Sequence, residues 1–513
     1  MEPTSPRPNS HSLEALIAHQ AESRGSASYL LEARGARALS FSQLFDDVVE
    51  KRNQFVALGI GRGTRVGLLL SDPLTFSTWF LAGLANGVWV APLDPTVTLQ
   101  NLHHVDERAL ALSLATVLSD RDAPKSALVT WINVVDGLDQ ADEQSIARFN
   151  VMVDDGGVLL SSSGTTGTPK VMALPTAQLL DTAELIARHN ELSTSDRGFN
   201  PLPLWHVNAE VVGLLATLVA GSSLVLDDRF HRTGFWKIVD DFEITWINAV
   251  PAIISHLVTL HDGETPAPRV RFVRSASAPL SPLLFAEFES STGIPIIQSY
   301  GMTEAASQIC ANPLHGVRKA GSVGVPVGVS VRVVPLDDET STNGVDIGHI
   351  EIMGPTVIRA YESAAYDDRF DVEGWLRTGD LGYFDDDHYL FIVGRSDDVI
   401  NRGGEKIYPL EIENVLATVE GVAIVAVIGE SDEVFGQVPV AYVQPSDAET
   451  LISSGALGDL VQRIRLSATE AFSKAYRPAI VKVVGGFPSH ATGKIRKGLL
   501  REGDVTVVHE ERL

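Results

Sequence analysis

Hydroxyl groups and glycines crowd together in one short segment of the chain, and a lysine closes it. The segment 161–170 reads Ser-Ser-Ser-Gly-Thr-Thr-Gly-Thr-Pro-Lys and follows the apolar run 157–160, which is typical of a buried strand. Glycine lets the backbone approach a ligand, so such a loop can present many N–H and hydroxyl donors to a polyanion. A polar linker is less consistent with a Pro-Lys end between two apolar runs. The pattern predicts a polyphosphate-binding loop. It is not a Walker A loop, because Lys170 follows proline and precedes Val171.

Four further motifs follow along the chain, and each combines glycine with polar or charged side chains. They read Gln298-Ser-Tyr-Gly-Met-Thr-Glu304, Gly374-Trp-Leu-Arg-Thr-Gly-Asp380, Gly394-Arg-Ser-Asp397 with Asn401-Arg-Gly-Gly-Glu-Lys406, and Thr492-Gly-Lys-Ile495. Together with the 161–170 loop, they resemble the adenylate-forming superfamily of acyl-CoA synthetases, adenylation domains of peptide synthetases and luciferase-like enzymes. Each motif alone is moderately specific. All five in the correct order, within about residues 38 to 500, make coincidence negligible.

The resemblance implies that the chain binds ATP and transfers its AMP part to a carboxylate. Both reactants are anions, so the site must supply positive charge and alignment more than proton transfer. The loop would wrap the β- and γ-phosphates of ATP. Relatives usually carry glycine after the Pro-Lys pair, whereas this chain has Val171, so the loop geometry there is expected to differ. The residues assigned to phosphate are Ser162, Ser163, Gly164, Thr165, Thr166, Gly167, Thr168 and Lys170.

The next motifs supply the remaining nucleotide and metal contacts that the resemblance implies. Glu304 would bind Mg²⁺, a hard cation that favours oxygen ligands, and Thr303 would hydrogen-bond the α-phosphate. Tyr300 would lie against the adenine ring. In isolation, we would interpret Tyr300 as a core aromatic and Glu304 as a helix N-terminal charge. Asp380 would accept hydrogen bonds from both ribose hydroxyls, with Arg395 on the same ribose. Also implied at the nucleotide are Ser277, Ala278, Pro279, Ser299, Gly301 and Met302.

The C-terminal motifs imply a moving domain. Lys494 would bridge the attacking carboxylate and the α-phosphate as charge develops, although without its motif such a lysine is usually a solvated surface residue. Asp397 lies at the family's hinge position, about which the C-terminal domain rotates after adenylation. The alternative is that Asp397 caps the next turn. After the rotation, Gly403 and Gly404 would line a tunnel for the pantetheine thiol of CoA.

The resemblance also locates the segments that bind the acid. His206 matches an aromatic residue or histidine that changes rotamer between the two half-reactions. Asn208 and Glu210 are polar where a long-chain fatty-acid enzyme would be apolar or small, so we predict a small or polar carboxylic acid. The alternative for Glu210 is that it starts the following helix and faces water. The predicted pocket residues are Trp205, His206, Asn208, Glu210, Arg274 and Gln298.

Several stretches resemble the oxalate- and short-acid-CoA ligase branch of the superfamily, among them Arg229-Phe230, Arg271-Phe-Val-Arg-Ser275 and Asn312-Pro-Leu314. We therefore predict an AMP-forming acid–CoA ligase that uses ATP, Mg²⁺ and CoA. Three alternatives stay open: an enzyme that loads a carrier-protein thiol, a ligase that activates another oxyanion, and a non-catalytic nucleotide-binding regulator. The presence of Lys494 argues against the non-catalytic regulator, because a protein that only binds nucleotide does not need this lysine.

Strand-like and helix-like segments alternate over the first half of the chain, which predicts parallel sheets covered by helices. Examples are the amphipathic helix 41–58, strand 65–70, helix 76–86, strand 88–93 and helix 211–220. Short β-branched runs over 321–352 predict a β-rich subdomain. We expect an α/β fold with a disordered tail (1–12), a large N-terminal ATP- and acid-binding domain of stacked sheets (13–395) and a small mobile α+β domain (396–513).

Size and charge limit the partners. A chain of 513 residues is too long for one core, and a formal net charge of -25 argues against nucleic acid and anionic membranes. The uncharged run 73–93 suits a buried helix and strand better than a membrane span. The N-terminus lacks the apolar core of a signal peptide. The single cysteine, Cys310, suits a reducing cytoplasm and a buried position. Monomer and homodimer both stay open.

Overall fold

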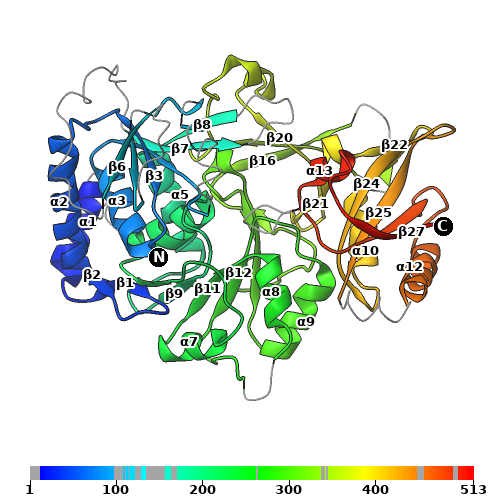
Figure 1. The fold of residues 1–513 in the computed structure, drawn as a ribbon, viewed down its shortest axis with the longest axis horizontal. Coiled ribbons are helices and arrows are strands. Elements are labelled where there is room, and N and C mark those ends of the chain that lie inside the picture. The colour runs from blue at the N-terminus through cyan, green and yellow to red at the C-terminus, as the bar shows by residue number, and fades with distance from the viewer. Residues whose placement is uncertain are drawn as a thin grey trace.

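The computed structural model describes residues 12–96, 105, 108–109, 111–114, 116–121, 129–134, 156–162, 170–260, 264–336, 341–342, 345–446, 456–488 and 495–513. Stacked sheets and helices fill the left and centre of Figure 1, and a smaller group of strands and helices forms its right-hand side. This arrangement confirms the predicted α/β fold with a large N-terminal and a small C-terminal domain.

The first sheet carries the two ends of the predicted phosphate loop. Its strand order is β6-β5-β3-β4-β7-β8, in which β7 and β8 are antiparallel and the other neighbours parallel. Ser162 ends β7 and pairs with Lys170 at the start of β8, so the two ends of the loop are neighbours at one edge. The strands are β3 (Arg65–Leu69), β4 (Trp89–Pro92), β5 (Thr116–Ser119), β6 (Thr130–Asn133), β7 (Gly157–Ser162) and β8 (Lys170–Pro175).

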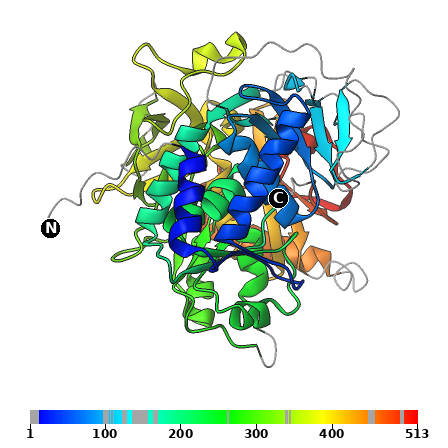
Figure 2. The ribbon, with the colours of Figure 1, turned by 90° about the vertical axis from the view of Figure 1, so that its left-hand side faces the viewer.

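Three N-terminal helices pack together on the side of the molecule that faces the viewer in Figure 2: α1 (Leu13–Arg24), α2 (Phe41–Ala57) and α3 (Pro73–Ala85). Helix α2 starts with a capping box between Ser40 and Gln43. Helix α3 starts with Asp72 as N-cap and Pro73 in its first turn, three residues before the predicted start. Because α3 is apolar on nearly every side, it is buried as a core helix. Among the residues described, none of the helices has the length and apolar character that crossing a bilayer demands.

The second sheet positions most of the acid-side residues. Its order is β15-β14-β13-β12-β11-β9-β10-β1-β2, and the run from β13 to β1 is parallel. The strands are β1 (Ser28–Glu32), β2 (Ala38–Ser40), β9 (Arg197–Asn200), β10 (Ser223–Leu226), β11 (Trp246–Ala249), β12 (Phe272–Ser275), β13 (Ile296–Tyr300), β14 (Cys310–Ala311) and β15 (Val325–Pro326). Its helices are α5 (Thr176–His189), α6 (Ala216–Ala220), α7 (Phe235–Asp241), α8 (Pro251–Leu257) and α9 (Pro282–Thr292).

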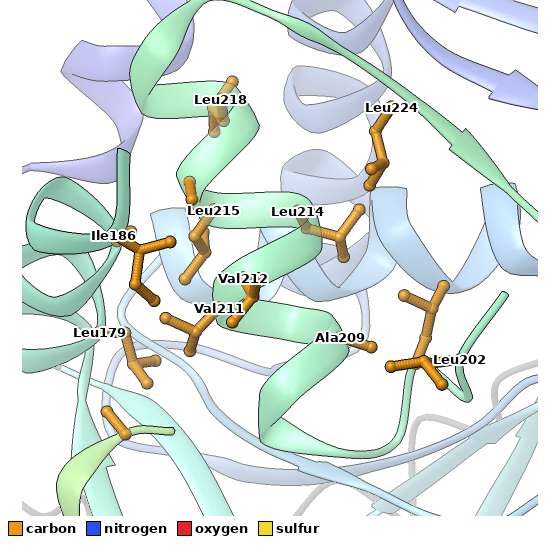
Figure 3. Close-up of a cluster of buried hydrophobic side chains, with 14 of the residues drawn as sticks. Leu179, Ile186, Leu202, Ala209, Val211, Val212, Leu214, Leu215, Leu218 and Leu224 are labelled. Atoms are coloured by element: carbon orange, nitrogen blue, oxygen red, sulfur yellow. The ribbon is translucent and has the colours of Figure 1, made fainter. Parts of the chain in front are cut away.

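The predicted helix 211–220 is partly wrong. Residues Ala209–Leu215 form a π-helix, η2, and α6 continues from it. Figure 3 shows Val211 on the side of Leu179 in α5, so apolar packing holds η2 in place. An apolar run of this length fits either kind of helix, so periodicity could not reveal the wider turn.

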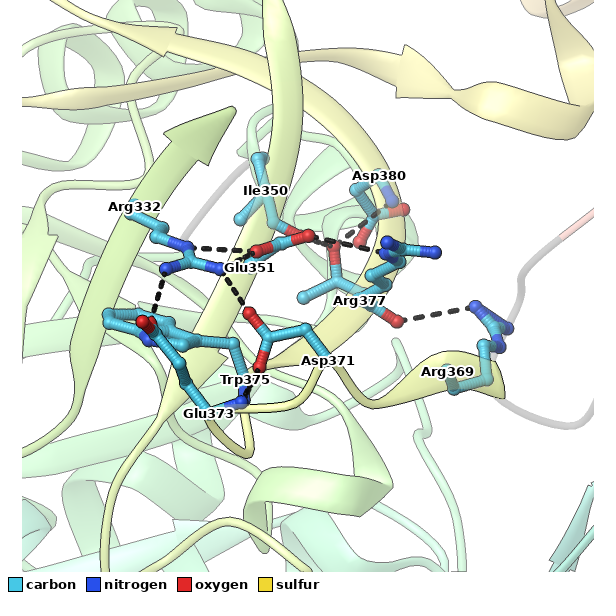
Figure 4. A network of polar contacts seen from close by, with 10 residues as sticks. Arg332, Ile350, Glu351, Arg369, Asp371, Glu373, Trp375, Arg377 and Asp380 are labelled. Carbon is cyan, nitrogen blue, oxygen red and sulfur yellow. Dashed lines mark hydrogen bonds and ion pairs between the residues drawn. The ribbon is translucent and has the colours of Figure 1, made fainter. Parts of the chain in front are cut away.

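A β-rich subdomain follows, as predicted, with the sheet order β16-β19-β20-β21. The strands are β16 (Ser330–Pro335), β19 (Gly348–Met353), β20 (Leu376–Phe384) and β21 (Leu390–Arg395), beside the short pair β17 (Ser341–Thr342) and β18 (Val345–Asp346). A charged network ties these strands together (Figure 4). Arg332 pairs with Glu351, Asp371 and Glu373, and its guanidinium lies 4.3 Å from the ring centroid of Trp375.

The C-terminal part has its own apolar core, distinct from that of the N-terminal domain. The strands are β22 (Ile400–Arg402), β23 (Glu405–Ile407), β24 (Val422–Asp432), β25 (Gly436–Pro445), β26 (Ile480–Val484) and β27 (Val507–Arg512); the helices are α10 (Pro409–Leu416), α12 (Leu457–Ala471) and α13 (Lys497–Arg501). Strand β27 was not predicted. The side chain of Tyr408 packs outside this core, against Ile347, Leu381 and Val393 of the β-rich subdomain. The exact boundary at Asp397 stays a prediction.

Candidate active site

Three predicted nucleotide residues meet at one point. Asp380 of β20 and Arg395 of β21 are direct partners in the antiparallel ladder. The Nη1 atom of Arg395 donates to Oδ1 of Asp380 at 3.2 Å, and the hydroxyl of Tyr300 donates to Oδ2 of the same carboxylate. Tyr300 ends β13 in a different sheet, so the fold joins two motifs that are 80 residues apart. The cluster gives a carboxylate with fixed orientation.

Burial and charge keep these three groups in complementary states. Burial raises the pKa of Tyr300 well above its usual value, and Asp380 adds to the rise, so the hydroxyl stays protonated and donates. Burial acts to lower the pKa of Arg395, but Asp380 and other anions outweigh it and the pKa is raised. Most of the Tyr300 ring is therefore enclosed, as expected if it were a core aromatic residue. Its hydroxyl, however, is hydrogen-bonded to Asp380.

Gly379 is required beside this cluster. Its φ of +81° lies in the left-handed region, and a Cβ there would lie 2.8 Å from Nη2 of Arg395 and 3.1 Å from Nη1 of Arg369. Thr378 fixes the strand next to it, because its hydroxyl donates to the carbonyl of Ile350 and accepts from the N–H of Asp380. Figure 4 shows this contact continuing into the Arg332 network. The ladder and the network hold Asp380 in one position.

Glu304 lies in a short 3-10 helix, η3 (Thr303–Ala305), and is 8% exposed. The hydroxyl of Tyr361 donates to its Oε1 atom at 2.8 Å. Burial raises the pKa of Tyr361, and the charge of Glu304 raises it further, so Tyr361 is a donor at neutral pH. A carboxylate held by one hydrogen bond suits Mg²⁺, which prefers oxygen ligands. Glu304 does lie in the first turn of a helix, as the alternative interpretation expected, but it is buried and bonded to Tyr361.

Lys170 lies among charged groups from distant parts of the chain. Its Nζ atom is 5.0 Å from the ring centroid of Tyr366. Burial lowers the pKa of Lys170, and the cations of Arg369 and Arg395 lower it further, while the charge of Glu304 acts in the opposite direction. Adjacent cations that repel one another favour an anion between them. This arrangement suits a phosphate chain.

The segment expected beside adenine lies at the end of β12. Ser277 and Pro279 are exposed and Ala278 is half-buried, and Ser277 has a φ of +72°, which is uncommon for a residue other than glycine. The side-chain amide of Asn208 donates to the hydroxyl of Ser277 at 3.2 Å. This contact links the predicted adenine segment to the acid-side residues.

A polar layer runs from Ser277 into the protein. Asn248 of β11 donates through Nδ2 to Oδ1 of Asn200 at 2.8 Å and of Asn208 at 3.0 Å. Arg274 is the register partner of Asn248 on the neighbouring strand, so both side chains face the side that carries η2. Arg274 is 1% exposed, and its Nη2 atom donates to Oε1 of Gln308 at 2.6 Å.

Gln298 does not join this layer. It pairs in register with Ser275, and successive residues of a strand point to opposite faces, so Gln298 and Arg274 lie on opposite faces of the sheet. The sequence interpretation grouped these two residues in one pocket. Ser299 is also buried and donates to the carbonyl of Ser275 at 3.2 Å. The pocket role of Gln298 stays a prediction without this geometric support.

Glu210 is fully buried in η2, which contradicts the alternative that it faces water. Neither of its carboxylate oxygens has a hydrogen-bond partner within the described residues. Burial raises its pKa well above the usual value, which favours the neutral form of the side chain. The nearby rings of Trp205 and His206 lie 6.1 Å apart, centroid to centroid, and both side chains are half-buried.

The remaining predicted residues lie as follows. Asp397 is exposed in a 3-10 helix (Ser396–Asp398), and Gly403 and Gly404 are exposed between β22 and β23. The backbone of Gly301 passes Ser307, whose carbonyl oxygen lies 1.8 Å from where a Cβ would be, and Met302 is half-buried before η3. Outside the described residues lie the Ser162 side chain, Ser163, Gly164, Thr165, Thr166, Gly167, Thr168 and Lys494.

Sequence reasoning missed the contribution of the segment 361–369. Tyr361 contacts Glu304, Tyr366 lies under Lys170, and Arg369 lies close to Lys170 and donates to the carbonyl of Arg377. No motif marks these residues, because the partners of Tyr361 and Tyr366 are 57 and 196 positions away along the chain. The sole local signal is the cluster of aromatic and charged residues before the Gly374 motif.

Comparisons with known proteins agree with this geometry. A model of the AMP-binding enzyme family matches residues 17–362, and a model of the AMP-binding enzyme C-terminal domain matches residues 411–494. The chain is 33% identical to a sulfoacetate–CoA ligase of Cupriavidus necator, covering 94% of this chain and 96% of the relative. It is 31% identical to an oxalate–CoA ligase of Arabidopsis thaliana, covering 92% and 95%. The structure of an o-succinylbenzoate–CoA synthetase of Bacillus subtilis with ATP and magnesium superposes with a TM-score of 0.80 at 26% identity, covering 95% and 98%.

Proposed function

Because the chain belongs to the AMP-binding enzyme family and is an AMP-forming acid–CoA ligase, we propose that its substrate is a small carboxylic acid with a second polar group. The observation that supports this proposal most directly is the buried polar layer of Asn208, Asn248 and Arg274. A long acyl chain in contact with this layer would leave polar groups without partners, at about 1–3 kcal/mol each. A small acid with its own polar atoms would satisfy them. Two relatives are named for such acids, sulfoacetate and oxalate.

The reaction has two steps. In the first, a carboxylate oxygen attacks the α-phosphorus of ATP, the bond to the β-phosphate oxygen breaks, and pyrophosphate leaves. In the second, the CoA thiolate attacks the carbonyl carbon of the acyl adenylate, and AMP leaves as the carbon–oxygen bond breaks. Both steps bring anions together, so the site must stabilise charge rather than only transfer protons.

We assign the residues as follows. Asp380, held by Tyr300 and Arg395, accepts hydrogen bonds from the two ribose hydroxyls of ATP. Lys170 and the preceding loop bind the β- and γ-phosphates, and Arg369 adds positive charge there. Glu304, supported by Tyr361, would hold Mg²⁺, which supplies positive charge at the phosphate oxygens. Thr303 lies in the same 3-10 helix as Glu304 and is assigned to hydrogen-bond the α-phosphate.

Lys494 is proposed to bridge the carboxylate and the α-phosphate during adenylation. We expect Lys494→Ala to abolish acyl-AMP formation while leaving reaction of a preformed acyl-AMP with CoA largely intact. Asp397→Pro is expected to do the reverse, because proline stiffens the proposed hinge. Equal loss of both steps in either variant would contradict the assigned roles.

A pyrophosphate-release screen tests the substrate class. Purified enzyme with ATP and Mg²⁺ is offered two- to four-carbon acids with a second polar group, matched unsubstituted acids of equal length, and eight- to sixteen-carbon fatty acids. We expect release with the first set and a CoA thioester by mass spectrometry when CoA is added. Preference for fatty acids would overturn the proposal.

Two further expectations stay predictions. A carrier protein as a further partner stays untested, and a phosphopantetheinylated carrier in the same assay would reveal transfer to its thiol. A reducing cytoplasmic compartment was expected from the single cysteine. Cys310 is buried in β14, and burial raises the pKa of its thiol, so it has the properties of a small apolar residue rather than a nucleophile.

A further inference from the structure

Arg274 is a buried cation without a counter-ion. It is 1% exposed, and its Nη1 atom has no hydrogen-bond partner in the part of the chain that the structure describes. The printed contact of its guanidinium is to a neutral amide, that of Gln308. Burial lowers the pKa of Arg274 to about 9, so the group remains charged at neutral pH. A buried charge with one partner missing is strongly unfavourable, so an anion that completes it would bind with a large gain.

The groups around Arg274 are neutral or share its sign. Asn248 is its partner in register, and Gln308 accepts from Nη2. His189, at the end of α5, is close enough that the Arg274 charge helps burial to lower the histidine pKa, which keeps the imidazole neutral. Glu210 is buried too, but no interaction with Arg274 contributes to the pKa of either group. Within the described ranges, no carboxylate balances the guanidinium.

The position of Arg274 relates it to the reacting carboxylate. Arg274 lies three residues before Ser277, and Asn208 connects the adenine segment to Asn248 beside it. On the other side, Gln308 follows the Thr303–Ala305 turn that carries the proposed α-phosphate and Mg²⁺ residues. Arg274 is therefore linked, through Asn248 on one side and Gln308 on the other, to two segments that would bind the nucleotide.

We propose that Arg274 is the specificity-determining residue of this ligase and binds a second anionic group of the acid substrate. This inference rests on the proposed function, which requires only a second polar group. From the charge of Arg274 we infer that this second group is an anion, a carboxylate or a sulfonate, which the planar guanidinium can bind through Nη1. A short acid with one anion at each end would place its reacting carboxylate at the α-phosphate and its other anion at Arg274.

Matched acid pairs test the proposal in the wild-type enzyme. The probes are malonate with its monoamide, oxalate with oxamate, and sulfoacetate with methylsulfonylacetate, each compared by kcat/KM in pyrophosphate release at saturating ATP. The members of each pair have similar size and differ by one negative charge. We expect a preference of at least about tenfold for the dianion in the preferred pair. Equal use of the dianion and the monoanion in every pair would overturn the role of Arg274 and leave the proposed function standing.

Variants then assign the preference to one residue. Arg274→Gln should lower kcat/KM for the preferred dianion about 100-fold and change the value for its monoanionic partner less than about threefold. Arg274→Lys should recover part of the loss. Arg271→Gln is the matched control, because Arg271 is already paired with Asp196, 3.0 Å away, and should keep the dianion preference. ATP affinity measured by calorimetry reports whether each variant is folded.

The outcomes separate the two proposals. Loss of activity toward both members of a pair, with ATP binding intact, would make Arg274 a structural residue and overturn the inference. Failure of every small acid in the wild-type enzyme would instead overturn the proposed function. If Arg274→Gln does not fold, the comparison of acid pairs in the wild-type enzyme still decides.

Discussion

The nucleotide side and the acid side of this site treat their buried polar groups in opposite ways. Around Asp380, each charged group has a protein partner: Tyr300 and Arg395 donate to the carboxylate, and Thr378 holds the backbone. On the acid side, Arg274 in the polar layer has an unpartnered Nη1 within the described residues, and Glu210 in the adjoining π-helix has neither oxygen paired there. One side is complete before ligand arrives, and the other is not.

The difference separates two ways to prepare a site. Nucleotide is common to the whole family, and a preformed cluster lowers the cost of ordering groups when ATP binds. The acid varies between relatives, and unsatisfied groups make binding depend on the complementary ligand, because an acid that leaves them unpaired is penalised. Replacing a paired polar group on the nucleotide side should therefore lower the free energy of unfolding. Replacing an unpaired polar group on the acid side should raise it.

Asp380→Asn should have the largest effect. The amide cannot accept from both Tyr300 and Arg395 as the carboxylate does, so we expect a loss of about 2–3 kcal/mol in unfolding free energy and a fall of about 100-fold in kcat/KM for ATP. Urea denaturation and ATP–pyrophosphate exchange measure these two quantities. Asp386→Asn, an exposed position in the β20–β21 turn, is the control. Stability equal to the wild type would remove the contrast between the two sides.

Glu210→Leu should act in the opposite direction. Leucine has similar volume and no polar atoms to leave unpaired, so we expect the free energy of unfolding to rise by about 1–3 kcal/mol. The measurement is urea denaturation at pH 5 and pH 8.

The pH dependence of this gain has a defined sign. Burial raises the folded pKa of Glu210, so the folded state keeps a proton that the unfolded state releases. The stabilising contribution of that proton is complete below the usual pKa of glutamate and is lost as pH rises through the raised folded pKa. The advantage of Glu210→Leu should therefore grow from pH 5 to pH 8. A constant difference would show that Glu210 is not protonated by burial.

Gly379→Ala should cost about 1–2 kcal/mol of unfolding free energy and weaken ATP binding, because its Cβ would meet Arg395 and its φ of +81° is strained. Gly374→Ala is a matched control: its φ is +89°, but no atom lies within 4 Å of the added Cβ. Both variants carry the backbone strain, and Gly379→Ala alone carries the clash. Equal ATP affinity in the two would contradict the positioning of Arg395 by Gly379.

Tyr361→Phe should have the smallest effect, about 0.5–1.5 kcal/mol for one hydrogen bond. Because that bond holds Glu304, we expect the Mg²⁺ concentration for half-maximal activity to rise severalfold. Tyr389→Phe, which removes a hydroxyl bonded to the carbonyl of Val317, should lower stability without moving the Mg²⁺ dependence. A shift in both variants would mean that Tyr361 has no special relation to Glu304.

Motifs selected residues that the fold brings together at Asp380, because these residues lie in short segments whose order is itself informative. Tyr300, Asp380 and Arg395 were found in this way, and the ladder of β20 with β21 explains why they meet. Tyr361 and Arg369 were not found, since their contacts depend on chain packing over long separations. Local patterns predict strands and their turns, but not which distant tyrosine will face a given carboxylate.

The acid side was predicted less completely for a geometric reason. The sequence interpretation grouped Gln298 with Arg274, but the register of β12 and β13 places them on opposite faces. The alternative position of Glu210, facing water, is also wrong, because the π-helix lies within apolar packing and buries this residue. Face and helix type depend on pairing with other elements, so residue types alone could not reveal them.

The ring of Tyr408 extends from the C-terminal unit into a small apolar patch formed by Ile347, Leu381 and Val393, where it is 1% exposed. Two of these residues belong to the strands that carry Asp380 and Arg395. The proposed rotation of the C-terminal unit would exchange the loop of Lys494 for the loop of Gly403 and Gly404. A rotation of that size would have to remove the Tyr408 ring from this patch and bury it elsewhere. Exposure of the Tyr408 ring would then add an energy barrier to the domain movement and stabilise the orientation seen in this structure.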